Sequence, residues 1–156
     1  MKILMVSSEA VPFAKTGGLA DVAGALPRAL HRLGHDVRLA LPAYRCVSEA
    51  GLPLLKGRRS VSVPLDGRLH KGLLRQGSLD DMPVYLLENK EFFHRDGLYG
   101  DAEGDYSDNP LRFAFFCRAV LALLRRLDFR PDIIHINDWQ TALIPVYLRT
   151  ELRFDP

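Results

Sequence analysis

The sequence predicts an α/β domain built on a doubly wound, Rossmann-like and mostly parallel sheet. Three neighbouring segments carry this prediction: a short apolar run at 2–6, a helical pattern at 19–33 and a second apolar run at 36–41. A strand, a helix and a strand in this order pair the two strands in parallel through a right-handed crossover. Further strands and helices alternate along the chain, as they do in doubly wound folds.

The first strand is predicted because its apolar run is short and is bounded by small polar residues. In the helix that follows, apolar residues recur at three- and four-residue spacing from Leu19 to Leu33. Pro27 lies inside this helix and is expected to bend it or to remove one hydrogen bond. Gly34 is expected to end the helix, and Pro42 ends the second strand.

The middle of the chain predicts three short strands rather than a strand–helix alternation. They are expected at 60–65, 69–74 and 84–87, with turns at Asp66-Gly67 and Asp80-Asp81. Short strands joined by tight turns pair antiparallel, so this part is expected to be an antiparallel excursion from the main sheet.

The last part returns to alternation. Asn109 is expected to cap a helix that has Pro110 at its first position and runs to Leu127. This helix is nearly all apolar, which predicts that it is mostly buried. A strand at 133–137 and a helix at about 140–149 follow.

Composition narrows the classes of function. The chain has 156 residues, of which 47% are hydrophobic and 26% are charged, as in an ordinary globular domain. A net charge of +2 gives no electrostatic reason for a nucleic acid or an anionic membrane as a partner. Cys46 and Cys117 form neither a metal-ligand spacing nor a disulfide framework, so a cytoplasmic setting is expected. The opening apolar run is too short for a signal peptide, and no run is long enough to span a membrane.

A glycine pair enters the first helix from the loop that follows the first strand. Gly17 and Gly18 let the backbone come close to a ligand, and the amino end of the helix favours an anion, to which Lys15 adds a positive charge. This pattern predicts a phosphate group. The alternative is that the two glycines only form a tight turn and that Lys15 is a solvated loop residue. Neither a P-loop nor a G-x-G-x-x-G signature is present.

A second candidate site follows the strand at 133–137, since ligands bind at the carboxyl ends of strands in open α/β sheets. Asn137 and Asp138 could form hydrogen bonds with sugar hydroxyls, and Trp139 could stack on a sugar face. The alternative is that Asp138 caps the next helix and that Trp139 belongs to the core. These residues taken alone favour the alternative.

The acidic stretch from Asp96 to Asp108 resembles the start of an EF-hand loop. The glycine and glutamate that such a loop needs are replaced by Tyr106 and Arg112, so calcium is rejected and a solvated loop is expected. No arrangement of residues predicts a metal site, a cofactor or a nucleophilic catalytic set. The remaining histidines are expected to be exposed or structural: His31, His35, His70 and His94.

Support for the two candidate sites is stronger when they are taken together. Residues 15–22 read K-T-G-G-L-A-D-V and follow an opening strand that ends in Ser-Ser-Glu. This segment resembles the signature of bacterial glycogen synthases and plant starch synthases. The resemblance continues at 24–27, 41–42, 106–109, 112–113 and 130–140.

The resemblance implies a retaining GT-B glycosyltransferase that extends an α-1,4-glucan from ADP-glucose, or from UDP-glucose in some relatives, without an obligatory metal. Residues 1–156 would then be part of its amino-terminal, acceptor-side domain, and the carboxyl-terminal donor-binding domain would lie outside this chain. No measurable glucosyl transfer is therefore expected from the chain alone. The alternative is a glucan-binding module of the same fold without catalysis.

The resemblance also assigns substrate-binding roles. Lys15 and the amides of Gly17 and Gly18 would contact the phosphates of the nucleotide sugar. Asp21 and Asp138 would lie beside the transferred glucose and the acceptor, with Trp139 next to them. Two positions depart from many relatives: Asn137 stands in place of a histidine, and Phe93 in place of a tyrosine near the acceptor.

Overall fold

The computed structural model describes residues 1–51 and 59–153. Its main sheet has six strands in the order β3-β4-β5-β2-β1-β8, and β6 and β7 form a separate two-stranded hairpin. The elements, in chain order, are β1 (Lys2–Val6), α1 (Gly18–Arg32), β2 (Asp36–Pro42), α2 (Arg45–Glu49), β3 (Ser60–Leu65), β4 (Arg68–Leu79), β5 (Met82–Glu88), α3 (Lys90–Phe93), β6 (Gly100–Asp101), β7 (Gly104–Asp105), α4 (Asn109–Leu124), β8 (Ile133–Ile136), the 3₁₀ turn η1 (Trp139–Thr141) and α5 (Leu143–Arg149).

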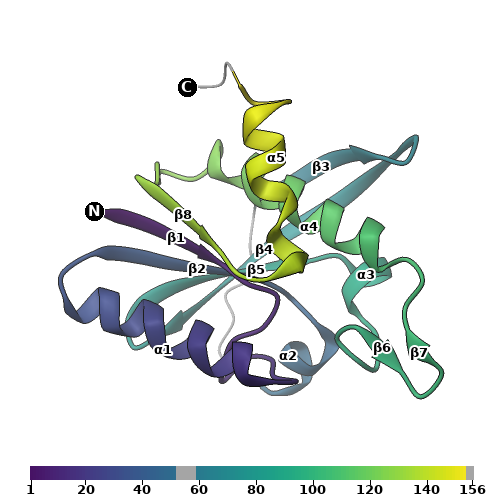
Figure 1. Cartoon of the computed structure of the whole chain (residues 1–156), viewed down its shortest axis with the longest axis horizontal. Coiled ribbons are helices and arrows are strands. Elements are labelled where there is room, and N and C mark those ends of the chain that lie inside the picture. The colour runs from purple at the N-terminus through teal and green to yellow at the C-terminus, as the bar shows by residue number, and fades with distance from the viewer. Residues whose placement is uncertain (52–58, 154–156) are drawn as a thin grey trace.

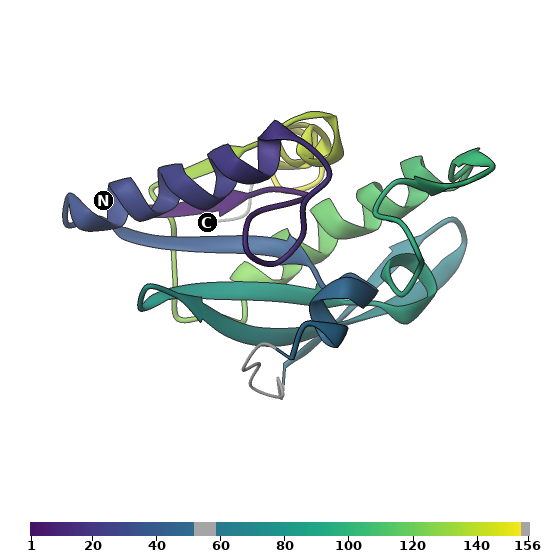
Figure 2. The ribbon, with the colours of Figure 1, turned by 90° about the horizontal axis from the view of Figure 1, so that it is seen from below.

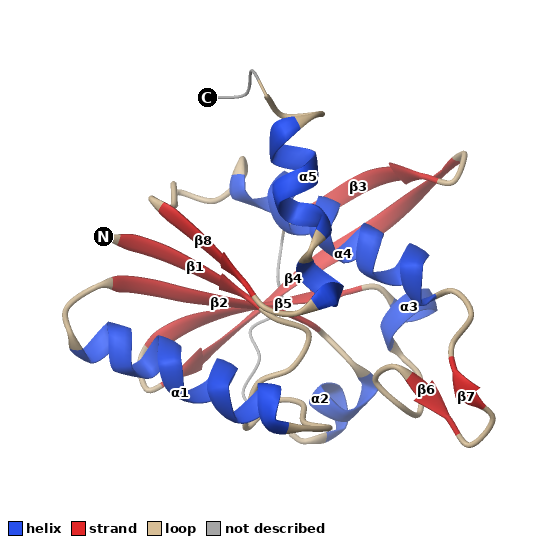
Figure 3. Ribbon diagram, in the orientation of Figure 1, coloured by secondary structure: helices blue, strands red, loops and turns tan. Residues whose placement is uncertain are grey.

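The fold class predicted from the sequence is confirmed. Strands β8, β1, β2 and β5 are parallel neighbours, and β3 and β4 extend the same sheet as antiparallel strands. The strands fan out from a common centre because the sheet is strongly twisted (Figures 1 and 3). The antiparallel excursion is therefore continuous with the main sheet, since β5 pairs with β2 along Leu39↔Val84 to Pro42↔Leu87.

Both faces of the central strands are buried. Along β1, Ile3 and Met5 point to one face, and Leu4 and Val6 point to the other, because side chains alternate along a strand; all four are at most 4% exposed. Helix α1 packs along β2 on one side of the sheet, as Figure 2 shows, and α4 packs against β3, β4 and β5. Strands buried on both faces read as continuous apolar runs, which is why the sequence located β1 and β2.

The start of α4 differs from the prediction. Asp108, not Asn109, is the residue before the helix, and its side chain makes no capping hydrogen bond. The Asn109 side chain instead accepts from Arg112 and donates to the carbonyl of Tyr99. Asn109 is thus drawn into the helix by a buried partner one turn later, a contact that local spacing does not reveal.

Other elements also differ in length from the prediction: α4 ends at Leu124 rather than Leu127, and β5 begins two residues earlier than residue 84. Strand β4 extends to Leu79, beyond the predicted end at residue 74, because β5 pairs with it as far as Leu79↔Met82. The last helix is divided into the turn η1 and α5. The expected helix stop is confirmed, since Gly34 has φ +85°, and Pro27 lies buried inside α1.

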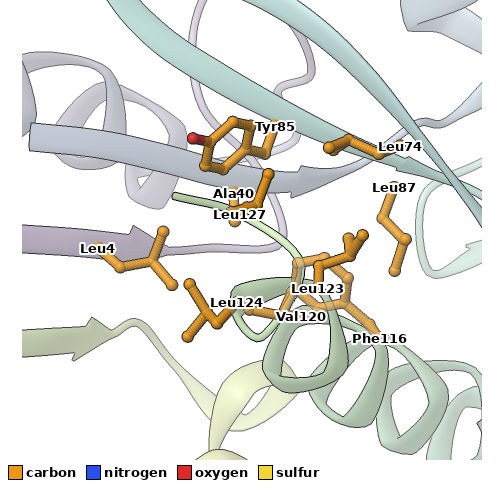
Figure 4. A pocket seen from close by; sticks show the side chains of 10 residues that line it. All are labelled: Leu4, Ala40, Leu74, Tyr85, Leu87, Phe116, Val120, Leu123, Leu124 and Leu127. Atoms are coloured by element: carbon orange, nitrogen blue, oxygen red, sulfur yellow. The ribbon is translucent and has the colours of Figure 1, made fainter. Parts of the chain in front are cut away.

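A small apolar hollow lies between the sheet and α4, lined by side chains such as Leu4, Tyr85 and Phe116 (Figure 4). The space inside it that can hold the centre of a water-sized sphere is only about 10 Å³. The hollow is a packing gap in the core and is too small for a substrate.

The acidic stretch is partly built into the fold. It forms the β6–β7 hairpin, and Arg95 pairs with Asp108 at 2.5 Å. Within residues 1–51 and 59–153, no group of three or more metal-ligating side chains is found. Among the same residues, no helix has the length and apolar character needed to cross a bilayer. His70 is structural, as expected: it is buried against the rings of Phe92 and Phe115.

Candidate functional site

The two candidate loops meet at the carboxyl edge of the sheet. They follow β1 and β8, which are parallel neighbours with Val6 opposite Ile136. The Asn137 side chain joins the loops by donating to the carbonyl of Val6 at 2.9 Å. Asn137 is only 9% exposed, and its side-chain amide connects β8 to β1.

A buried carboxylate, that of Glu9, binds the backbone of the glycine loop from the protein interior. Glu9 is 3% exposed and accepts hydrogen bonds from the backbone amides of Thr16 at 2.6 Å and Gly17 at 3.2 Å. It also accepts from the Thr16 hydroxyl at 3.0 Å. The anion favoured by the amino end of α1 is thus supplied by the protein itself, and the Gly17 amide already has an acceptor.

An exposed ion pair lies on the outer side of the same loop. Lys15 Nζ donates to the two carboxylate oxygens of Asp21 at 2.7 and 2.8 Å, and the side chains are 51% and 58% exposed. Exposed pairs of this kind contribute about 0–1 kcal/mol. A ligand phosphate could therefore replace Asp21 as the partner of Lys15 with little loss of free energy.

The glycines of the motif have different reasons to be glycine. A Cβ atom added at Gly17 or Gly18 would meet nothing within 4 Å, so open space lies over the loop. A Cβ at Gly24 would lie 2.5 Å from the Val11 Cγ2 atom and 2.9 Å from the Val11 carbonyl oxygen. Gly24 is required by the packing of α1 on the loop, whereas packing does not require Gly17 and Gly18.

Asp138 combines a structural role with a strained backbone. Its side chain accepts from the Trp139 amide at 2.7 Å, so it caps η1, as the structural alternative predicted. Its φ of 61° and ψ of −179° lie in a region that is nearly restricted to glycine and costs about 1–3 kcal/mol. Its side chain remains exposed. A strained, exposed acid at the edge of the sheet is typical of a functional site.

Trp139 is not a core residue. It is 51% exposed, and its ring rests edge-on against Phe113, with centroids 5.1 Å apart. On another side it contacts the ring of Tyr99, at 6.3 Å. The indole is therefore held by aromatic neighbours while about half of it stays open to a ligand.

Tyr99 is the functional candidate that sequence reasoning missed. Its hydroxyl donates to Glu9 at 2.9 Å and shares a hydrogen bond with Ser8 at 2.7 Å. Burial raises the pKa of Tyr99 well above its ordinary value, and the charges of Glu9 and Asp138 raise it further. Tyr99 thus contacts both loops, because its hydroxyl binds Glu9 and its ring lies against Trp139.

Phe93, expected near the acceptor, lies in the core at 0% exposed, against the rings of Tyr44 and Phe116. The tyrosine beside Trp139 is Tyr99, which the sequence places within the acidic stretch. An aromatic residue next to a glycine in that stretch, Tyr99-Gly100, is the signal that could have indicated it.

The geometry gives this edge a limited chemistry. The two loops at this edge carry an exposed lysine, two exposed carboxylates and an exposed indole: Lys15, Asp21, Asp138 and Trp139. They suit an anionic group next to a polyhydroxylated one, and they include no nucleophile with its own base. Parallel strands whose carboxyl-edge loops carry such groups define a ligand-binding α/β domain of the doubly wound class.

Comparison with known proteins specifies the family. Residues 2–156 match the starch synthase catalytic domain family. The chain is 63% identical over 156 residues to glycogen synthase 2 of Geobacter sulfurreducens and 54% identical to the glycogen synthase of Syntrophotalea carbinolica; it covers 32% of each. The chain belongs to the starch synthase catalytic domain family.

A solved structure shows the same fold. The catalytic domain of starch synthase IV from Arabidopsis thaliana, bound to ADP and acarbose, superimposes with a TM-score of 0.84 at 35% identity. The match covers 95% of this chain and 30% of that one. The chain thus spans about a third of the length of the proteins it matches.

Proposed function

We propose that this chain is the amino-terminal part of a retaining glucosyltransferase that moves glucose from ADP-glucose to the non-reducing end of an α-1,4-glucan. The observation that carries the proposal is the convergence of Lys15 and the glycine loop with Asp138 and Trp139 at one edge of the sheet. The names of the relatives support it, as does the ligand pair, ADP and acarbose, named for the Arabidopsis enzyme. In this proposal residues 1–156 belong to the acceptor-side domain, and the donor-binding domain lies in the two thirds of the relatives that the chain does not match.

Each exposed residue has a role that follows from its chemistry. Negative charge develops on the departing diphosphate during transfer, and a fixed cation with oriented amides stabilises that charge. Lys15 and the Gly18 amide supply these groups, and the Gly17 amide joins them only if it leaves Glu9. Asp21 holds Lys15 until the phosphate arrives.

The loop after β8 supplies the groups that would bind the sugars. Asp138 accepts hydrogen bonds from sugar hydroxyls, and the open half of Trp139 gives a flat apolar surface for a sugar face. The described residues contain no complete catalytic set, so the proposal includes no glucosyl transfer by the chain alone. We also place the protein in the cytoplasm, because the thiol of Cys46 is free and exposed and such thiols persist in reducing compartments.

A chimera tests the function. The segment of the Geobacter sulfurreducens enzyme that this chain matches would be replaced by this chain, and glucose transfer from ADP-glucose to glycogen would be measured. We expect activity in the chimera and a fall of about 10- to 100-fold in kcat/KM for ADP-glucose in Lys15→Ala, because a hydrogen bond to a charged group contributes about 1.5–3 kcal/mol. The matched control is Lys71→Ala, an exposed lysine on β4. An equal kcat/KM in the two lysine variants would exclude the phosphate role.

A second function remains open because the exposed Trp139 surface is complete within this chain. A glucan-binding module without catalysis would bind maltooligosaccharides in the absence of any nucleotide sugar. Titration of the 156-residue chain with maltohexaose separates the two functions, since binding together with an inactive chimera would favour the binding module.

A further inference from the structure

Arg112 is a buried cation whose hydrogen-bond acceptors are all neutral. It is 0% exposed. Its Nε donates to the Phe92 carbonyl at 2.7 Å, its Nη2 to the Leu98 carbonyl at 3.0 Å and its Nη1 to Asn109 Oδ1 at 2.6 Å. Among the ion pairs of the described residues, none includes Arg112.

This arrangement is unfavourable by itself. Burial lowers the pKa of Arg112, and a buried charge without an ionic partner carries a large desolvation penalty. Aromatic rings surround the guanidinium, with those of Tyr106 and Phe113 at 5.1 and 5.3 Å. A long apolar side chain would pack among these rings without the penalty. The reason for an arginine must therefore lie in what its hydrogen bonds hold in place.

Those bonds hold the segment that carries Tyr99. The Leu98 carbonyl is bound directly, and Asn109, itself bound to Arg112, donates to the Tyr99 carbonyl at 2.8 Å. The Arg112 guanidinium thus fixes the main chain on both sides of Tyr99 Cα, directly at Leu98 and through Asn109 at Tyr99.

The side chain of Tyr99 links this segment to the loop after β1. Its hydroxyl donates to Glu9 Oε1 at 2.9 Å, while Glu9 Oε2 accepts from the Thr16 and Gly17 amides. Hydrogen bonds on the main chain and on the hydroxyl of Tyr99 therefore connect α4, through this one residue and Glu9, to the amino end of α1.

We infer that Arg112 is a positioning residue for the glycine loop, acting through Asn109, Tyr99 and Glu9 on the amides of Thr16 and Gly17. The loop is then placed before any ligand arrives, and its position depends on a residue that touches no substrate. The importance of this placement for glucosyl transfer rests on the proposed function, but the series of contacts itself does not.

Site-specific hydrogen exchange of the 156-residue chain tests the inference without any nucleotide sugar. The first variant is Tyr99→Phe, which removes only the hydroxyl between Glu9 and Ser8. We expect the Thr16 and Gly17 amides to exchange about 3- to 10-fold faster, the effect of losing one buried hydrogen bond, while the amides of β2 stay unchanged. The matched control is Tyr85→Phe, whose hydroxyl accepts from Arg38 away from this loop.

The second pair of variants examines the arginine. Arg112→Gln removes the Leu98 contact and is expected to speed Thr16 and Gly17 exchange more than it speeds exchange in β2, and Arg112→Lys is expected to restore part of the protection. The control is Arg118→Gln on the same helix, because Arg118 binds the Pro64 carbonyl and Glu151 instead. If Arg112→Gln does not fold, Tyr99→Phe and Arg112→Lys decide the question.

Unchanged exchange at Thr16 and Gly17 in Tyr99→Phe would overturn the inference, as would equal acceleration of all amides in the Arg112 variants. Neither result would affect the proposed function, which depends on Lys15 in the transfer assay. Conversely, an inactive chimera would leave the exchange result standing.

Discussion

Gly18 and Gly24 lie on the same helix, α1, and replacing each by alanine should have opposite consequences for stability. In Gly24→Ala the new methyl group would lie 2.9 Å from the Val11 carbonyl oxygen and 2.5 Å from its Cγ2 atom. The side-chain atom can rotate away, but the carbonyl belongs to the backbone, so the loop after β1 must move. The Val11 amide also donates to the Ala20 carbonyl at 3.0 Å, and this hydrogen bond would be strained.

The magnitude is the difference of two terms. Overpacking a close contact costs about 1–3 kcal/mol, whereas alanine is favoured over glycine inside a helix by about 1 kcal/mol. We expect a net loss of up to about 2 kcal/mol, which lowers the Tm of a domain of this size by up to about 8 °C. In Gly18→Ala the methyl group meets nothing within 4 Å, so the Tm should stay the same or rise slightly.

Thermal unfolding followed by circular dichroism measures both variants under identical conditions. A Tm for Gly24→Ala equal to or above that of Gly18→Ala would refute the steric argument. In the chimera the two variants should also separate by function, since Gly18→Ala should raise the KM for ADP-glucose by obstructing the open space over the loop while leaving stability intact.

Three more predictions concern the edge of the sheet and its supports. Trp139→Ala should weaken maltohexaose binding about 3- to 10-fold, the range for losing one aromatic contact, with little change in Tm because the indole is half exposed; calorimetric titration checks this, and unchanged affinity would exclude the stacking role. Asp138→Gly should raise the free energy of unfolding in urea by about 1 kcal/mol. Relief of the backbone strain at positive φ exceeds the few tenths of a kcal/mol that are lost with the capping hydrogen bond. A less stable variant would show that the backbone is not strained. The hydrogen bond from Arg95 lowers the pKa of Asp108, so the pair stabilises the fold above the ordinary aspartate pKa of about 3.9, and this contribution is lost as the pH falls through the depressed pKa. Asp108→Asn should therefore be less stable than wild type at pH 7, with the difference vanishing toward pH 2, and a difference independent of pH would contradict the assignment.

Much of the scaffold could be predicted because its information is local. Strands β1, β2 and β8 are apolar runs, and α1 has a clear period and a glycine stop. The sequence joined Asp138 and Trp139 with the glycine loop only through the resemblance to a family signature, and the structure places both at the carboxyl ends of neighbouring parallel strands. The candidate site was therefore located from two short motifs that are more than a hundred residues apart.

The predictions failed where a residue's role depends on a partner distant in the chain. Asn109 fits the composition of a cap, but Arg112 and Tyr99 draw its side chain into a buried network. Phe93 stands where many relatives have a tyrosine near the acceptor, and the sequence did not reveal that its side chain is fully buried in the core.

The sequence by itself determined the main strands and helices and the parallel pairing of β1 with β2, because periodicity and turn residues encode these features within a few positions. The exposure of Trp139 at the edge of the sheet was not among them, since the residues taken alone favoured a core position. Only the tertiary structure decided what supports that edge. Glu9, Tyr99 and Arg112 come from three separate segments, and their charges and hydroxyls have defined partners only once the sheet brings these segments together. A hydrogen bond is specified by distance and direction between two groups, and neither quantity can be read from one segment alone.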